Sequence, residues 1–445
     1  MRTIAAISTP SGTGGIAVIR ISGDEAFCVT DKVFKGQGTK RLFEVPANTV
    51  VFGRIVDSEG KEIDQVLASV FRAPHSFTGE DVVEISCHGG ILNTKQILKT
   101  VLEAGAVLAD KGEFSKRAFL NGKIDLAQAE GIIDLINAVS EKGADKAVFQ
   151  MEGRLSKEIG DLREVLLNLA AHLEAAADFP EEDIDELAPE AVLSTLKESL
   201  ARMDKMLKTA SYGKVLREGL PVAVIGKPNV GKSSILNYLA GEDRAIVTDI
   251  AGTTRDVIEE FVNLDGVPIK LMDTAGIHET DDVVEKIGVE KSKNAADQAT
   301  FLLAVFDGSK PLDEKDEEIL NLVKDRPHAI ILNKCDLGKA VSLSGIEVSA
   351  KQGDGMDELV KALVQFASGD VSERDTVITN ERHYECLLHC KEAVQRAVDS
   401  AELGMPTDML TVDIQTAIEN LGEITGQTVS QEIVDRVFHN FCLGK

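Results

Sequence analysis

The order of hydrophobic and polar positions divides the chain into segments of different secondary structure. Residues 1–118 contain several short runs of strand character and one run at helical spacing, which predicts an N-terminal α+β domain. The expected strands are Gly15–Ile21, Thr49–Val56, Gln65–Phe71 and Asp81–Ser86, and the expected helix is Ile91–Glu103.

Apolar residues recur at helical spacing over residues 119–215 and again over residues 373–445, which predicts the core faces of a helical bundle. Residues 216–372 alternate strand and helix patterns, as in a parallel α/β domain. We therefore expect a multidomain protein in which an α/β domain is inserted into an all-α helical domain, since chain ends often lie close together. The helical stripes are Ile132, Leu135, Ile136 and Val139; Leu155, Ile159, Leu162 and Leu166; Leu193, Leu196, Leu200, Met203 and Leu207; Leu410, Ile414, Ala417, Ile418 and Leu421; and Ile433, Val434, Val437, Phe438 and Phe441.

The net charge of the chain limits which nucleic-acid partners it can bind. The formal net charge is −26, from 48 basic and 74 acidic side chains. Such a surface repels nucleic-acid phosphates, so we expect no DNA partner, and any RNA contact must be local or shared with a more basic protein. The acid-rich stretch 178–190 predicts a solvated bend, with a functional acidic patch as the alternative.

Cysteine usage and hydropathy bear on the compartment. Six scattered cysteines fit a reducing environment better than a disulfide framework. No window approaches the ~18 apolar residues of a membrane span, so we expect a cytoplasmic protein with no membrane contact.

The most specific pattern opens the inserted domain. Gly226-Lys-Pro-Asn-Val-Gly-Lys-Ser233 follows the apolar run Pro221–Gly226 and precedes the helical run Ser234–Ala240. GxxxxGKS between a strand and a helix predicts a phosphate-binding P-loop. Backbone N–H groups would surround phosphate oxygens, Lys232 would reach the β- and γ-phosphates, and the Ser233 hydroxyl would bind Mg²⁺.

Three further motifs follow in the order of the Ras-like GTPases. They are Asp273-Thr274-Ala275-Gly276 after the apolar run Ile269–Met272, Asn333-Lys334-Cys335-Asp336 after Ala329–Leu332, and Ser349-Ala350-Lys351 after Ile346–Val348. An aspartate at 273 can contact Mg²⁺ through water. Asp336 can accept two hydrogen bonds from guanine, and adenine has no matching donor pair, so we expect GTP rather than ATP.

Hydrolysis needs a separate explanation, because Ile277 stands where Ras-like enzymes place a water-orienting glutamine. Either the domain is a slow switch that awaits an external activator, or it recruits another charge. Asn229 and the stretch 249–256 favour the second option, with a monovalent cation beside the phosphates and Thr254 as a second protein ligand of Mg²⁺. Arg255 is an alternative source of charge, or a member of a structural ion pair.

Weaker patterns lie outside the nucleotide motifs. Cys442 is either a nucleophile or ligand in an exposed tail beside Lys445, or a small buried apolar residue. The turn after His88 is a tight bend or part of a ligand pocket. His383, Cys386, His389 and Cys390 imitate a metal cluster, but one helix rarely supplies a whole zinc site.

Several motifs together carry a resemblance that runs the length of the chain. They are the P-loop, Asp249-Ile-Ala-Gly-Thr-Thr-Arg-Asp256, Asp273–Gly276, Pro10–Gly15, Phe77–Asp81, Gly112–Lys123 and the terminal Cys442-Leu-Gly-Lys445. The chain resembles the potassium-activated Era/TrmE-type GTPases, and within them the MnmE (TrmE) family. The resemblance implies a tetrahydrofolate-binding, dimer-forming domain over residues 1–118, a helical domain over 119–215 and 373–445, and an inserted G domain over 216–372.

The implied activity is hydrolysis of GTP coupled to modification of the wobble uridine of certain tRNAs at carbon 5, which gains an aminomethyl or carboxymethylaminomethyl group. The implied cofactors are Mg²⁺, K⁺ and 5-formyl- or 5,10-methylenetetrahydrofolate. The implied assembly is a homodimer that joins an MnmG/GidA-type FAD protein in a heterotetramer, with FAD supplied only by that partner. Potassium would also promote dimerisation of the G domains.

The resemblance also implies individual site residues. Its folate contacts fall on Arg20, Glu84, Lys123 and Lys445; its potassium ligands on Asn229, Thr248, Ile250 and Thr253; its magnesium ligands on Ser233 and Thr254; and its catalytic residues on Glu285, which would position water, and Cys442. Its GTP contacts fall on Asn229, Val230, Gly231, Lys232, Ser233, Ser234, Thr248, Asp249, Ile250, Ala251, Gly252, Thr253, Thr254, Asp273, Thr274, Ala275, Gly276, Asn333, Lys334, Asp336, Ser349, Ala350 and Lys351.

Two rival functions use the same G motifs. A regulatory or ribosome-assembly GTPase of the Era type should carry a basic RNA-binding appendage such as a KH-type GxxG loop. Helical spacing and the terminal Cys-Leu-Gly-Lys follow the G motifs instead. A folate-binding scaffold without catalysis would have no use for an intact phosphate and Mg²⁺ site.

Overall fold

The computed structural model describes residues 2–38, 41–178, 188–241, 245–246, 260–272, 296–369, 371–372 and 375–445. Within these ranges the chain forms two compact units. One comprises residues 1–133 with 422–445, and the other residues 134–421.

The first unit is built on a seven-stranded sheet with strand order β3-β4-β5-β6-β2-β1-β7. Neighbouring strands are antiparallel except β1 and β7, which are parallel. The strands are β1 (Ile4–Ile7), β2 (Ile16–Ser22), β3 (Phe34–Gly36), β4 (Thr49–Val56), β5 (Glu62–Phe71), β6 (Val82–His88) and β7 (Val107–Leu108). All four expected strands form, and β4 has the expected bounds.

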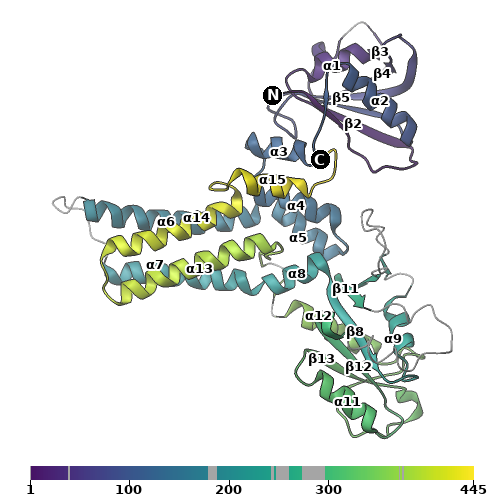
Figure 1. The fold of residues 1–445 in the computed structure, drawn as a ribbon, viewed down its shortest axis with the longest axis vertical. Coiled ribbons are helices and arrows are strands. Elements are labelled where there is room, and N and C mark those ends of the chain that lie inside the picture. The colour runs from purple at the N-terminus through teal and green to yellow at the C-terminus, as the bar shows by residue number, and fades with distance from the viewer. Residues whose placement is uncertain are drawn as a thin grey trace. The chain divides into compact units, whose positions relative to one another are not determined.

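Two helices cover one face of this sheet, α1 (Ala26–Val33) and α2 (Ile91–Glu103) (Figure 1). Ile19 and Ile85 point to that face and are fully buried in the core. Because side chains alternate along a strand, Arg20 and Glu84 point to the opposite face. The helix pattern 91–103 is confirmed, and the α+β class of this segment with it.

The remaining elements of the first unit include the helices through which the two ends of the chain meet. They are η1 (Leu42–Glu44), α3 (Glu113–Leu120), α4 (Leu126–Asn137), which crosses into the second unit, and α15 (Gln431–His439). Phe119 and Phe438 are 6.1 Å apart between ring centroids, and Lys116 pairs with Asp435. These contacts dock α15 against α3.

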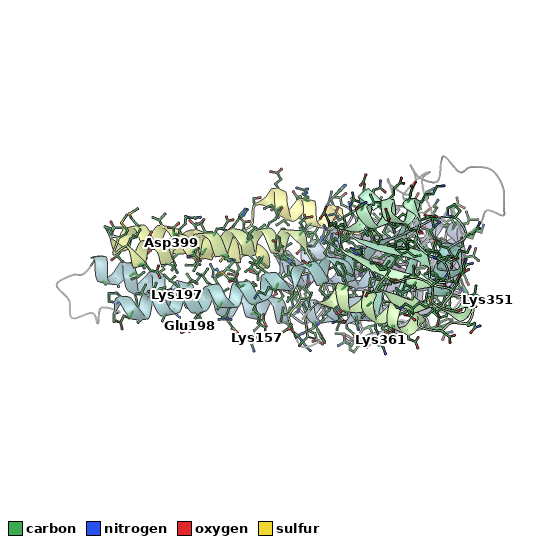
Figure 2. The ribbon with its side chains drawn as sticks, turned by 90° about the horizontal axis from the view of Figure 1, so that it is seen from below. Lys157, Lys197, Glu198, Lys351, Lys361 and Asp399 are labelled. Atoms are coloured by element: carbon green, nitrogen blue, oxygen red, sulfur yellow. The ribbon has the colours of Figure 1, made fainter. Side chains whose placement is uncertain are left out.

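Long helices form the first part of the second unit. They are α5 (Glu141–Met151), α6 (Arg154–Asp178), α7 (Pro189–Lys208), α8 (Ala210–Glu218), α13 (Glu381–Glu402) and α14 (Thr407–Thr425). Figure 1 shows α6, α7, α13 and α14 side by side as a bundle. Exposed charges such as Lys197 and Glu198 of α7 and Asp399 of α13 lie along its surface (Figure 2).

Most of the expected apolar stripes form the bundle core, with two corrections. The stripe of α6 is buried, as are Leu410, Ile414, Ala417, Ile418 and Leu421 of α14. On α7 the buried face is displaced by one residue from Leu193, Leu200 and Leu207, because Val192, Ser199 and Met206 point inward. On α4 the expected stripe is wrong beyond Ile132, since Ile136 is 47% exposed and the helix ends at Asn137.

The second part is an α/β layer built on a seven-stranded sheet, with order β14-β13-β12-β8-β11-β10-β9. Strands β14, β13, β12, β8 and β11 are parallel, as expected, and β10 and β9 continue antiparallel. The strands are β8 (Leu220–Gly226), β9 (Ala245–Ile246), β10 (Glu260–Leu264), β11 (Val267–Met272), β12 (Phe301–Asp307), β13 (His328–Asn333) and β14 (Ile346–Val348). The helices are α9 (Lys232–Leu239), α11 (Glu314–Val323) and α12 (Met356–Ser368), with the 3₁₀ turn η3 (Cys335–Leu337).

The chain enters and leaves the α/β layer through one hydrogen-bonded junction. The Thr209 hydroxyl accepts from the N–H of Ile378 at 3.0 Å and lies 3.4 Å from the carbonyl oxygen of Thr376. Lys146 donates to the carbonyl of Asp375, and Lys205 pairs with its carboxylate, each at 3.0 Å. The helical spacing before and after the inserted motifs is therefore one structure, held together where the insertion begins and ends.

Over the described ranges, no helix combines the length and the apolar character that a bilayer crossing requires.

Two glycine-to-alanine changes, one at the junction and one away from it, should change the free energy of unfolding in opposite directions. Gly160→Ala in α6 places its Cβ in open space, so we expect about 0.5–1 kcal/mol of stabilisation from helix propensity. Gly213→Ala in α8 drives its Cβ into the carbonyl oxygen of Ile378, so we expect about 1–3 kcal/mol of destabilisation. Urea unfolding of both variants measures the difference. Equal stabilisation by the two changes would contradict the close approach at Gly213.

Candidate functional site

The P-loop connects the central strand β8 to helix α9. Its backbone is left-handed at Asn229, where φ is 64°, and at Gly231, where φ is 100°. A Cβ at Gly231 would overlap the Asn333 side-chain amide, and one at Gly226 would press on the carbonyl oxygen of Val305. The two glycines are therefore required by contact, and the loop curls over the carboxyl end of the sheet as the motif predicts.

Lys232 lies inside the curl of this loop. Its ammonium donates to the carbonyl oxygens of Gly226 and Lys227, both at 2.8 Å. Burial lowers the pKa of Lys232. A phosphate is the natural partner for a desolvated cation, so this ammonium is poised to exchange backbone oxygens for phosphate oxygens. Ser233 follows in the first turn of α9 with its side chain exposed, where a hydroxyl can serve as a Mg²⁺ ligand.

Asn333 connects the P-loop with the third and fourth motifs. Its side-chain amide donates to the carbonyl of Val230 at 2.8 Å and accepts from the N–H of Ala350 at 3.1 Å. The residue is 3% exposed at the end of β13. One buried side chain therefore satisfies the backbone of two loops, and brings residues 229–234, 333–336 and 349–351 to one edge of the sheet.

Lys334 closes the same edge. Its ammonium donates to the carbonyl of Asn229 at 2.7 Å and pairs with Asp307 at 2.8 Å. Burial raises the pKa of Asp307, but hydrogen bonds from Lys334 and Ser309 outweigh it, so the pKa is lowered. Asp307 had no assigned role in the sequence, and its position at the end of β12 was the signal for it.

The expected base pocket is open to solvent on its outer side. Asp336 and Lys351 are exposed, whereas Ser349 is buried and bonds through its N–H to the carbonyl of Asp354 at 2.9 Å. Ser349 thus anchors the loop, and the Asp336 side chain is open to solvent.

Part of the expected site lies outside the described residues. These residues are Thr248, Asp249, Ile250, Ala251, Gly252, Thr253, Thr254, Arg255, Asp273, Thr274, Ala275, Gly276, Ile277 and Glu285.

A second polar cluster lies on the face of the N-terminal sheet opposite α1 and α2. Arg20 of β2 and Glu84 of β6 are directly opposite in register, and Arg20 Nε donates to Glu84 Oε1 at 2.8 Å. The rings of Phe77 and Phe114 each lie 5.5 Å from the Arg20 guanidinium carbon. Two of the expected folate contacts therefore form an ion pair flanked by aromatic rings.

The final residues of the chain reach this pair. The carbonyl of Gly444 accepts from the Ser8 hydroxyl at 2.9 Å and from Arg20 at 3.5 Å. Burial and the charge of Arg20 lower the pKa of Lys445, against the opposing effect of Glu84 and Cys442. Lys445 therefore lies close enough to Arg20 and Glu84 for their charges to affect its pKa, and its role as a folate contact stays a prediction. Cys442 is exposed, so its side chain is not the buried apolar residue of the alternative.

Lys123 contacts the loop that follows β5. Its ammonium donates to the carbonyl of Pro74 at 3.0 Å, on the loop that carries Phe77. The same loop is held by a buried polar network whose members had no assigned role. Arg117 donates to both oxygens of Glu80, at 3.1 and 3.0 Å, and Glu80 accepts from the Ser22 hydroxyl at 2.7 Å.

Two weaker patterns receive structural explanations. After β6, a Cβ at Gly89 would overlap the carbonyl of Gly14, and His88 Nδ1 lies 2.7 Å from Asp64, so this segment is a tight bend. His383, Cys386 and Cys390 are buried in the bundle core. Burial raises the pKa of the Cys390 thiol, and no three potential metal ligands cluster anywhere in the described part of the chain.

Comparisons with known proteins cover the whole chain. The family model of the MnmE helical domain matches residues 126–442, and that of the GTP-binding protein TrmE N-terminus matches residues 3–123. The tRNA modification GTPase MnmE of Geobacillus kaustophilus is 46% identical over 457 residues, covering 100% of this chain and 99% of that protein. The protein of the same name from Bacillus cereus gives the same identity and coverage.

Among solved structures, the chain is similar to Era of Aquifex aeolicus bound to GDP.AlF4-, with 29% identity and a TM-score of 0.26. That similarity covers 39% of this chain and 65% of the other. Both family models and the full-length identity show that the chain belongs to the MnmE family of tRNA modification GTPases.

Proposed function

We propose that this protein hydrolyses GTP and couples the hydrolysis to modification of tRNA. The observation that carries the GTPase assignment is the Asn333 bridge, which joins the P-loop to the loop at 349–351. A phosphate cradle and a base pocket on one sheet edge fit a nucleoside triphosphate. Asp336 supplies an acceptor that suits guanine and that adenine cannot match.

Each described residue has a defined task in this mechanism. Backbone N–H groups of residues 229–234 surround the phosphates, and Lys232 moves from two carbonyls to the β- and γ-phosphate oxygens. Ser233 would hold Mg²⁺, which neutralises charge on the phosphates when bound. Lys334 fixes the loop at Asn229 from outside, so its role is support of the cradle.

The missing glutamine at Ile277 points to a cation-assisted hydrolysis. Asn229 is exposed at the rim of the P-loop, with its backbone in the left-handed region and its carbonyl held by Lys334. That leaves the side-chain oxygen as the donor for K⁺, beside the carbonyls of Thr248, Ile250 and Thr253. Thr254 would complete the Mg²⁺ site, and Glu285 would orient the attacking water.

The N-terminal unit fits a tetrahydrofolate and the transfer of a one-carbon unit. The pterin edge carries paired donors that suit Glu84, and the folate carboxylates suit Arg20, Lys445 and, on the adjacent loop, Lys123. Phe77 and Phe114 offer aromatic faces next to these charges. Cys442, exposed on the segment that ends at Lys445, is the candidate for a covalent role.

The remaining proposals concern assembly. We infer a homodimer through the N-terminal unit and a heterotetramer with an MnmG/GidA-type FAD protein in the cytoplasm. The charge of −26 supports the heterotetramer, because a more basic partner would help so acidic a protein to hold tRNA, unless the RNA contact is local. The Era-type alternative is disfavoured by the helices α13, α14 and α15, which follow the G motifs where an RNA-binding appendage would stand.

Asp336→Asn tests the base pocket. The change reverses an acceptor and a donor, so preference should move from GTP toward xanthosine triphosphate by about 100-fold or more. Competition between the two nucleotides measures the shift. Asp357→Asn removes an exposed carboxylate from the first turn of α12 and should leave the preference unchanged. Unaltered preference in Asp336→Asn would remove this residue from the base pocket.

Arg20→Ala and Glu84→Ala test the folate site. Each leaves one charge of the pair without its partner, so affinity for 5-formyltetrahydrofolate should fall by at least about 30-fold, with GTP turnover retained. Isothermal titration measures the affinity. Arg54→Ala breaks an exposed ion pair of the same sheet and serves as the control. Full affinity in both site variants would refute the assignment.

Potassium dependence tests the hydrolytic mechanism. K⁺ adds charge where an arginine finger is worth about 10³–10⁵ in rate, so turnover should be much faster in K⁺ than in Na⁺ at equal ionic strength. Asn229→Ala should abolish that response, Glu285→Ala should slow hydrolysis without preventing GTP binding, and Asn263→Ala in the β10–β11 hairpin should behave as the parent. Equal rates in the two salts, with Asn229→Ala fully active, would favour Arg255 or an external activator.

A further inference from the structure

Lys227, the second residue of the P-loop motif, connects the loop to the start of helix α11. Its ammonium donates to Asp313 Oδ2 at 2.7 Å and to Asp316 Oδ2 at 2.6 Å. Both acids belong to the N-terminus of α11, far along the chain from the P-loop. The Lys227 side chain is 21% exposed, so the contact is partly shielded from water.

The two acids already have a structural task, which fixes their positions. Asp313 is the N-cap of α11 and Asp316 its third residue, and together they form a capping box. Asp316 is 3% exposed, and among the described residues none hydrogen-bonds to its buried Oδ1. A buried carboxylate with one unsatisfied oxygen depends strongly on the cation that pairs with the other.

The electrostatics favour the charged forms of Lys227 and Asp313. Burial lowers the pKa of Lys227, but the hydrogen bonds that it donates to Asp313 and Asp316 outweigh this effect, so the pKa is raised. The hydrogen bond from Lys227 lowers the pKa of Asp313. Lys227 and Asp313 thus each stabilise the charged form of the other in this contact.

The backbone of Lys227 extends this contact to the phosphate site. Its carbonyl oxygen is one of the two that accept from the Lys232 ammonium, at 2.8 Å. A continuous path thus runs from the cap of α11 through the Lys227 side chain and carbonyl to the lysine that would meet the phosphates. Loss of the side-chain contact would remove one of the restraints on the direction of the Lys227 carbonyl, and leave the hydrogen bond from Lys232.

We propose that Lys227, held by Asp313 and Asp316, is a positioning residue that fixes the P-loop and thereby the affinity for the nucleotide phosphates. The inference rests on the proposed nucleotide site and goes beyond it, since Lys227 itself would not contact the nucleotide. The clamp acts on binding, because it sets the geometry of the cradle before any bond is broken.

The test uses the full-length chain with GTP and Mg²⁺. Lys227→Met keeps the length of the side chain and removes its charge, so KM for GTP and Kd for GDP should rise about tenfold, with kcat within about twofold of the parent. Lys227→Arg should restore both constants, because a guanidinium can bridge the two carboxylates. Arg326→Met is the matched control, since it removes the Arg326–Asp297 pair before β12 and β13, at the opposite edge of the sheet.

A second pair of variants keeps the test valid if Lys227→Met folds poorly. Asp313→Asn and Asp316→Asn remove negative charge, yet asparagine can still accept the capping hydrogen bonds. Both should raise KM for GTP, as Lys227→Met does. The rise in a double variant with Lys227→Met should be smaller than the product of the two single fold-changes.

Three results bear directly on the proposal. Parental KM and Kd in Lys227→Met would overturn the clamp, as would an equal rise in Arg326→Met, which would show a general loss of stability. A parent that neither binds nor hydrolyses GTP would instead refute the proposed function, so the two failures are distinguishable.

Discussion

The junction at residues 209–213 and 375–379 is the constraint on which the second unit depends. An inserted domain is compatible with a continuous helical bundle only if its entry and exit segments lie together. Here Thr209 bonds across to Ile378, and Gly213 allows the backbone at Ile378 to approach where a side chain would collide. Tyr212 and Leu216 of α8 share an apolar cluster with Val267 and Ile269 of β11. The entry helix is therefore also part of the core beneath the sheet.

The phosphate site is also held together by polar contacts between segments that are distant in sequence. Loops that are distant in sequence are fixed by single polar side chains, Asn333 on one flank and Lys227 on the other. Hydrogen bonds from a buried amide direct the backbone more specifically than apolar contact, because the amide has one orientation that satisfies both partners. The glycine at 231 is the counterpart of this arrangement, since any larger residue would displace Asn333. The backbone conformation of the P-loop is thus determined by side chains that contact it from neighbouring elements.

Periodicity and motif context predicted most of the architecture. They failed where tertiary contacts determine which face of a helix is buried or which side chains pair. The bounds of β4, β14 and α2 agree with the patterns, because alternation and helical spacing are local properties. The face of α7 was displaced by one residue, since Ser199 and Met206 are buried by neighbours that no local pattern reveals. The motifs brought Lys232 and Asn333 to one edge, as predicted. Glu80 and Arg117 lie in stretches that carry the family resemblance, but neither had an assigned role, because their contact joins partners distant in sequence. Asp307 had no assigned role either, although its position at the end of β12 marked the carboxyl edge of the sheet.

The pairing of Arg20 with Glu84 has a consequence for what can enter the N-terminal site. A molecule with a single charge could engage only one member, and it would leave the other partly desolvated without a partner. A molecule that offers a carboxylate at one end and a flat donor edge at the other can replace both halves of the contact at once. The ion pair thus works as a filter for bifunctional molecules. It would discriminate against simple anions and simple amines, however abundant they are.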